Sequence, residues 1–201
     1  MISNIVLPKQ IYIIRHADKQ INLEIPEPPF GIDIEGNRNY HSLIPRGWQR
    51  AGALIGLFDP VTKVLSRDLE RPTSLFSPLF GTLKNTKLQR TYQTIIGLAE
   101  RLNIKINNLV SVGEEEELAW YILNAYTDVI LISWEHHHIP ILAKEFPTIN
   151  STDVPQVWPD DRFDVIWSFT LDNELGQYIF SQMPQQLLAG DTDTVIPVQI
   201  N

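Results

Sequence analysis

The chain has 201 residues, and its 43% hydrophobic and 20% charged composition is that of an ordinary globular protein, which excludes a disordered or fibrous chain. The formal charge of −8 argues against nucleic acids and anionic membranes as partners, and the lack of cysteine excludes disulfides, a thiolate nucleophile and Cys-based zinc sites. The first ten residues lack the apolar core of a secretory signal and no run approaches a membrane span, so we expect a cytoplasmic protein.

A run of β-branched and aromatic residues at 11–14 predicts the first buried strand. Arg15 and His16 follow it directly, at the carboxyl end of the strand, where open α/β sheets bind ligands. A ring nitrogen of His16 there is placed to attack a phosphoryl group, while Arg15 holds the phosphoryl oxygens. Taken alone, however, such a pair is more often the start of an ordinary exposed loop.

Residues 19–45 form a long segment without helical or strand periodicity, interrupted by Pro26, Pro28, Pro29, Gly31 and Gly36. A loop of that length inside a compact domain is uncommon, and it predicts either a lid or binding loop or a disordered surface insertion. Arg38 in this loop is a candidate for contacting the part of a ligand that lies outside a phosphate pocket. An ordinary surface position is the alternative for this residue.

Helices are predicted where apolar residues recur every three or four positions. Such spacing runs over 45–58 and again over 89–103, so Arg90 falls near the amino end of the second helix. A third helix is predicted to follow the acidic run 114–117 and to reach residue 125, because acidic side chains at a helix start are favoured by the helix dipole.

Short apolar runs predict the remaining strands, at 73–77, 109–112, 128–133, 163–169 and 177–180, with a turn at 172–173. The run 128–133 is almost continuously apolar, which is typical of a central parallel strand covered on both faces, and it leads into His136 and a further helix. The alternation of strands and helices, with no repeat and no linker, predicts one α/β domain over 1–201.

Four elements resemble, in the same order, those of the histidine phosphatase superfamily with its phosphoglycerate mutase-like fold. Arg15-His16-Ala17 resembles the Arg-His-Gly signature, and residues 45–51 resemble the start of the first helix. Residues 88–94 resemble the segment with the second phosphate-pocket arginine, and 130–136 resemble the strand that leads to the second catalytic histidine. The resemblance covers most of the chain, and its Trp-Glu-His triplet is similar to that of a small, poorly defined branch.

This resemblance implies a three-layer α/β/α sandwich with a central, mostly parallel sheet. It implies a phosphatase that hydrolyses a phosphomonoester through a phosphohistidine on His16, with Arg15, Arg90 and His136 around the phosphoryl oxygens. Two guanidiniums and an imidazole compensate the phosphate charge without a metal or other cofactor. The expected substrate is a small phosphorylated molecule or a phosphoprotein; a phosphate-binding regulatory module without turnover and a phosphomutase are the alternatives.

The acid that protonates the leaving group has two candidate positions in the family. In the mutase-like branch a carboxylic acid follows the third strand, where Glu114 or a neighbour lies. Four glutamates at a helix start are, however, usually a solvated helix face. In the phytase-like branch an Asp follows the second histidine, but here His137 stands at that position.

The histidine run 136–138, preceded by Glu135, also suggests a metal site. Consecutive side chains point in different directions, whereas metal-binding histidines on a helix are spaced so that they share one face. We therefore expect no physiological metal at this run.

Overall fold

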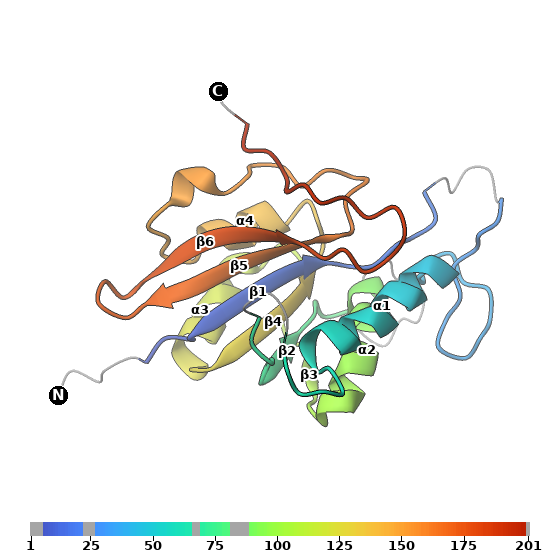
Figure 1. Cartoon of the computed structure of the whole chain (residues 1–201), viewed down its shortest axis with the longest axis horizontal. Coiled ribbons are helices and arrows are strands. Elements are labelled where there is room, and N and C mark those ends of the chain that lie inside the picture. The colour runs from blue at the N-terminus through green and yellow to red at the C-terminus, as the bar shows by residue number, and fades with distance from the viewer. Residues whose placement is uncertain (1–5, 22–26, 66–68, 81–88, 200–201) are drawn as a thin grey trace.

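The computed structural model describes residues 6–21, 27–65, 69–80 and 89–199. Within these ranges, six strands form one mixed sheet in the order β3-β2-β4-β1-β5-β6 (Figure 1). The neighbours from β3 to β1 pair in parallel, whereas β5 and β6 are antiparallel to their neighbours. The strands are β1 (Gln10–Arg15), β2 (Ser74–Phe76), β3 (Ile106–Asn107), β4 (Val129–Trp134), β5 (Val165–Asp172) and β6 (Gln177–Pro184).

Helices cover both faces of this sheet (Figure 1). Side chains of β1 alternate between the two faces: Ile11 and Ile13 pack in the core beside α3 and α4, and Tyr12 and Ile14 pack beside α1 and α2. Because both faces are covered, β1 is apolar at successive positions. The described ranges contain no helix long and apolar enough to cross a membrane. The helices are α1 (Pro45–Phe58), α2 (Gln89–Leu102), α3 (Glu115–Ala125) and α4 (Ile139–Lys144), with a 3-10 turn, η1 (Ser151–Asp153).

The predicted α/β architecture is confirmed, and the sheet is mixed because the last two strands form an antiparallel hairpin. The predicted turn at 172–173 lies where β5 ends, and both hairpin strands extend further toward the C-terminus than their apolar runs indicate. The predicted helices over 45–58, 89–103 and 114–125 and the strand over 128–133 agree with α1, α2, α3 and β4 to within a few residues.

The strand predicted over 109–112 is wrong. The third strand lies earlier, at Ile106–Asn107, where Ile106 pairs with Leu75 of the short strand β2. Residues 109–112 form a loop instead, in which Leu109 is exposed and Val110 is buried in the core against α3. Val110 is apolar because its side chain packs in the core. Hydrophobic periodicity alone does not distinguish a buried loop residue of this kind from a residue of a strand.

The long loop over 19–45 is folded where the structure describes it, and residues 22–26 lie outside the described part. Its two arms are joined by backbone hydrogen bonds from Ile32 to Leu43 at 2.8 Å and from Asn39 to Gly31 at 2.8 Å. A Cβ on Gly31 would meet the Asn39 carbonyl oxygen at 2.2 Å, so only glycine permits this close approach. The indole of Trp48 in α1 donates to the Ile32 carbonyl at 2.8 Å and anchors the loop to α1.

Candidate functional site

Two histidines emerge side by side at the carboxyl ends of neighbouring strands. Strands β1 and β4 are parallel, and Arg15 is in register with Trp134. The residues that follow them, His16 and His136, therefore lie at the same edge of the sheet. Their ring centroids are 6.2 Å apart and the ring planes are nearly perpendicular, at 83°. The structure thus brings together the two histidines that the sequence singled out.

His16 is held as a neutral imidazole. This residue is only 5% exposed, and its Nδ1 is 2.8 Å from the Ala17 carbonyl oxygen. Because a carbonyl only accepts hydrogen bonds, Nδ1 carries the proton and Nε2 keeps its lone pair. Burial lowers the pKa of His16 well below its usual value, and the charges of Arg15, Arg90 and Lys19 lower it further. At neutral pH the ring therefore has an unprotonated nitrogen suited to nucleophilic attack.

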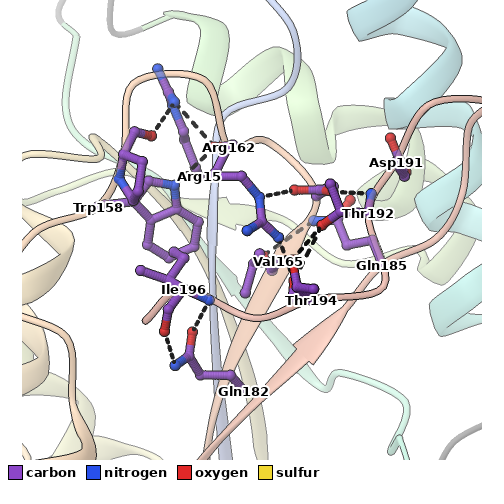
Figure 2. Close-up of polar contacts among 12 residues, drawn as sticks. Arg15, Trp158, Arg162, Val165, Gln182, Gln185, Asp191, Thr192, Thr194 and Ile196 are labelled. Atoms are coloured by element: carbon purple, nitrogen blue, oxygen red, sulfur yellow. Dashed lines mark hydrogen bonds and ion pairs between the residues drawn. The ribbon is translucent and has the colours of Figure 1, made fainter. Parts of the chain in front are cut away.

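Arg15 is a buried cation fixed at one end. It is 1% exposed, and its Nη1 donates to the backbone carbonyls of Asp160 at 2.7 Å and Pro159 at 3.2 Å. The same atom donates to the Arg162 carbonyl at 3.1 Å (Figure 2). The guanidinium carbon also lies 4.0 Å over the ring centroid of Phe163. Burial lowers the pKa of Arg15 to about 10, so it stays charged at neutral pH.

The other donors of Arg15 are available to an anion. Its Nε and Nη2 atoms are buried and have no hydrogen-bond partner among the described residues. Buried donors on a charged group are costly to leave unpaired, and an anionic ligand satisfies them. The Phe163 ring that supports Arg15 also packs on His16, at 5.9 Å between centroids. Arg15 and the His16 ring are thus both packed against one aromatic side chain.

Arg90 joins the site from the first turn of α2 and is 2% exposed. Its Nη2 donates to the Tyr40 carbonyl and its Nε to the Ser42 carbonyl at 3.4 Å, so the long loop closes on this guanidinium. Burial lowers the pKa of Arg90 to about 10, and its charge lowers the pKa values of His16 and Arg15. Its predicted place at the amino end of a helix is confirmed; residue 88 of the motif lies outside the described part.

His136 lies between two carboxylates and is 3% exposed. Its Nε2 is 2.6 Å from Asp160 Oδ1, and its Nδ1 is 2.6 Å from Glu135 Oε1, although the second contact is not aligned as a hydrogen bond. The contact with His136 holds the pKa of the Asp160 carboxyl below its usual range. Burial raises the pKa of Glu135, but contacts with His136 and His137 outweigh burial and lower it.

Sequence reasoning missed Asp160. It lies 24 residues after His136 in a turn with no motif of its own, and only the fold brings it to the site. Its backbone carbonyl accepts the shortest of the three Arg15 hydrogen bonds, while its side chain is 81% exposed. The local signal is the Pro159-Asp160-Asp161 sequence, which indicates a turn but not a partner.

The acidic run at 114–117 is placed differently from the expected acid. Glu114 is exposed, and its Oε2 accepts a hydrogen bond from the Ser111 backbone at 2.9 Å at the start of α3. Its neighbour Glu115 is the buried member, with Oε1 at 3.0 Å from Trp134 Nε1 and 3.0 Å from His138 Nδ1. The described contacts of Glu114 are therefore those of a residue at a helix start, and none of them reaches His16 or His136.

Arg38 lies on the outer side of the long loop. Its guanidinium is 3.5 Å from the centroid of the Phe30 ring and 4.9 Å from that of Tyr40, and it donates a hydrogen bond to the Tyr40 hydroxyl. The backbone carbonyl of Tyr40 is in turn an acceptor for Arg90. Arg38 is thus exposed in the loop, and it is connected to Arg90 only through Tyr40.

The histidine run converges more than we expected. Ligand atoms of Glu135, His136 and His137 lie within 4.8 Å of one another, and the rings of His136 and His137 are 3.9 Å apart. The expectation that these consecutive side chains point apart is wrong, because residues 135–138 form a tight turn in which the Glu135 carbonyl accepts from the His138 and Ile139 backbones. Both nitrogens of His136 already face carboxylates.

A cavity of about 400 Å³ lies next to Phe163, the residue that packs on His16, although neither histidine is part of its lining. Its lining includes Lys19 and Phe163, which also act on His16. Deeper in its wall, Asp18 binds Arg50 at 2.7 Å, and Arg50 binds Asp191 at 2.7 Å. Arg46 binds the same two aspartates, so two cations balance two carboxylates in this part of the cavity wall.

Comparison with known proteins yields no family assignment: no protein-family model matches the chain, and a search of curated proteins finds no match. What the fold and site define is an α/β protein with a buried pocket of two histidines and two arginines at the carboxyl edge of its parallel strands. In such sheets this edge is where ligands bind.

Proposed function

We propose that the chain is a metal-independent phosphatase that hydrolyses a phosphomonoester through a phosphohistidine on His16. The observation that carries the proposal is the state of His16: a buried, neutral ring whose Nδ1 donates to Ala17, leaving the Nε2 lone pair beside buried cations. A neutral nucleophile among fixed positive charges is what phosphoryl transfer requires. The unpaired donors of Arg15 give the same pocket its preference for an anion.

In the proposed reaction, His16 Nε2 attacks phosphorus, the bond to the leaving oxygen breaks, and that oxygen takes up a proton. Water then attacks the phosphohistidine and releases inorganic phosphate. Arg15, Arg90 and His136 compensate the negative charge in both steps, and the two-step route lowers the barrier of an extremely slow reaction. None of these steps requires a metal.

The order of the elements supports membership of the histidine phosphatase superfamily with its three-layer, phosphoglycerate mutase-like fold. The sheet with helices on both faces is compatible with that fold. The cavity of about 400 Å³ beside the pocket has room for a small phosphorylated molecule or a phosphorylated side chain of a protein. We therefore propose one of these as the substrate.

Hydrolysis of p-nitrophenyl phosphate tests the proposal, measured with and without EDTA for the native protein, His16→Ala and an Arg101→Ala control. Arg101 lies in the last turn of α2 and binds Asp59 at 2.8 Å. We expect turnover that survives EDTA, is abolished in His16→Ala and remains in the control, together with acid-labile phosphate on His16 by mass spectrometry. Full activity in His16→Ala would overturn the mechanism, and binding of phosphate without turnover would favour a regulatory phosphate-binding module.

A further inference from the structure

Asp160 is the only described carboxylate that combines contact with His136 Nε2 and free access to solvent. Its Oδ1 lies 2.6 Å from His136 Nε2 and 3.9 Å from His137 Nε2, and its side chain is 81% exposed. The other carboxylate on His136, Glu135, is partly buried on the Nδ1 side and accepts from the His137 backbone at 2.8 Å. Asp160 therefore combines a contact with the buried histidine and an exposed carboxyl group that can exchange protons with solvent.

The backbone of Asp160 is held firmly although its side chain is free. Arg15 donates to the Asp160 carbonyl and to those of Pro159 and Arg162, and Trp158 Nε1 donates to the Arg162 carbonyl at 2.9 Å. Arg162 itself binds Asp164 Oδ1 at 2.7 Å and the Thr194 carbonyl at 2.6 Å, which ties the turn to the C-terminal segment (Figure 2). A rigid backbone under a functional side chain preorganises its position.

We propose that Asp160 is the general acid and base of the phosphatase reaction, an inference that rests on the proposed function. Protonated Asp160 donates its proton to the leaving oxygen as the phosphorus–oxygen bond breaks and the bond from phosphorus to His16 Nε2 forms. The resulting carboxylate then takes a proton from the water that attacks the phosphohistidine. Phosphate is released, His16 regains its lone pair, and Asp160 is again protonated.

In this proposal, substrate binding favours the protonated form of Asp160. The titratable and charged groups that face it are His136, His137 and Arg15, and in the free protein the contact with His136 lowers the pKa of the Asp160 carboxyl. A bound phosphoryl group takes over the interaction with His136 and Arg15 and brings its own negative charge next to Asp160. Loss of a cationic partner and gain of a like charge both favour the protonated carboxyl. Asp160 is thus protonated when the substrate is bound, before the leaving group requires a proton.

The remaining acids near the site have other partners. Asp18 is bound by Arg50 at 2.7 Å and by Arg46 at 2.9 Å. Glu115 accepts from Trp134 and from Gly113, and Glu114 accepts from Ser111. These contacts explain why the acidic run after β3 does not supply the acid, and why an aspartate from a later turn can do so.

The test compares two substrates of similar size whose leaving groups differ in acidity, p-nitrophenyl phosphate and phenyl phosphate, in native protein, Asp160→Asn and Asp161→Asn. Asparagine keeps an oxygen for His136, and Asp161 is an exposed acid in the same turn. We expect Asp160→Asn to lower kcat/KM for phenyl phosphate by ~10²–10⁴-fold, the usual contribution of general acid catalysis, and to spare most of the rate with p-nitrophenyl phosphate. Asp161→Asn should keep the native ratio between the substrates.

An equal loss with both substrates in Asp160→Asn would mean that Asp160 only positions His136, and native rates with both would mean that it has no part in the reaction; either result overturns the proposal. Failure of the phosphatase function itself looks different. In that case the native protein turns over neither substrate, or His16→Ala retains the turnover. The thermal unfolding midpoint of Asp160→Asn serves as the folding control, and the exposure of this side chain leads us to expect no change.

Discussion

The backbone N–H of Ala17 donates to the Thr94 hydroxyl at 2.8 Å, and that hydroxyl donates in turn to the carbonyl of Arg90 at 2.7 Å. One side chain of α2 thereby links the residue after His16 to the first turn of α2, which carries Arg90. All three groups are buried. Thr94 therefore helps to fix the position of His16 relative to Arg90.

Replacing Thr94 by valine should cost stability, because the buried Ala17 N–H loses its acceptor. We expect the free energy of unfolding to fall by ~1–3 kcal/mol, the usual cost of an unsatisfied buried donor, as measured by urea denaturation. Thr94→Ser keeps the hydroxyl, so its free energy of unfolding should be much closer to that of the native protein than that of Thr94→Val. If Thr94→Ser and Thr94→Val were equally destabilised, the methyl group rather than the hydrogen bond would be the stabilising feature.

Replacing Arg90 by alanine should weaken transition-state stabilisation by ~2–4 kcal/mol, as for other preorganised donors to a developing oxyanion. The measurement is kcat/KM for p-nitrophenyl phosphate. Arg101→Ala is the matched control, since Arg101 lies on the same helix but binds Asp59 at 2.8 Å, away from the pocket. An unchanged kcat/KM in Arg90→Ala would remove this residue from the site.

The lowered pKa of His16 predicts how stability depends on pH. The unfolded chain protonates this ring below about pH 6.5, whereas the folded protein keeps it neutral to lower pH. The unfolded state then binds more protons, so the free energy of unfolding should fall as pH drops below about 6.5, by up to ~1.4 kcal/mol per pH unit from this group. Urea titrations at several pH values should show a shallower dependence for His16→Ala than for the native protein. The same pH dependence of the free energy of unfolding in both proteins would contradict this prediction.

Arg50 should be essential for the cavity wall. It is buried between Asp18 and Asp191 at 2.7 Å from each. Burial raises the pKa of Asp191, but hydrogen bonds from Arg50 and from the backbones of Leu188 and Leu187 outweigh it and lower the pKa to about 2. Arg50→Met would leave two buried carboxylates with only the more exposed Arg46 as a cation and should cost ~3–5 kcal/mol of stability.

The more exposed Arg46 binds the same two aspartates, and Arg46→Met is the control for this prediction, with a smaller loss in the same denaturation experiment. Equal losses in Arg46→Met and Arg50→Met would show that burial of the charge is not what makes Arg50 important.

Water rather than a second substrate should accept the phosphoryl group. Asp160 is largely exposed and contacts His136, so in the proposed mechanism it can take its proton from a water molecule supplied by solvent. With a labelled phosphomonoester and an excess of an alcohol acceptor, we expect the label to leave as inorganic phosphate. Label returned mainly to the acceptor would favour a phosphomutase.

The amino-acid sequence by itself determined the elements that carry the two histidines and Arg90. The apolar runs that end at Arg15 and Trp134 and the helical spacing after Gln89 are local patterns, and backbone geometry turns such patterns into strands and a helix wherever the chain is covered on the matching faces. Because carboxyl ends of parallel strands share one edge of a sheet, the meeting of His16 and His136 followed from these patterns.

Only the tertiary structure decided the position of β3, the convergence of Glu135, His136 and His137, and the place of Asp160. Val110 packs as a core residue in a loop, the tight turn after β4 folds neighbouring side chains together, and Asp160 reaches His136 from 24 residues away. Each of these depends on contacts between segments that are distant in sequence, or on a turn whose direction the surrounding core sets. Local periodicity carries no information about such contacts, because they form and stabilise the protein only when the chain has packed.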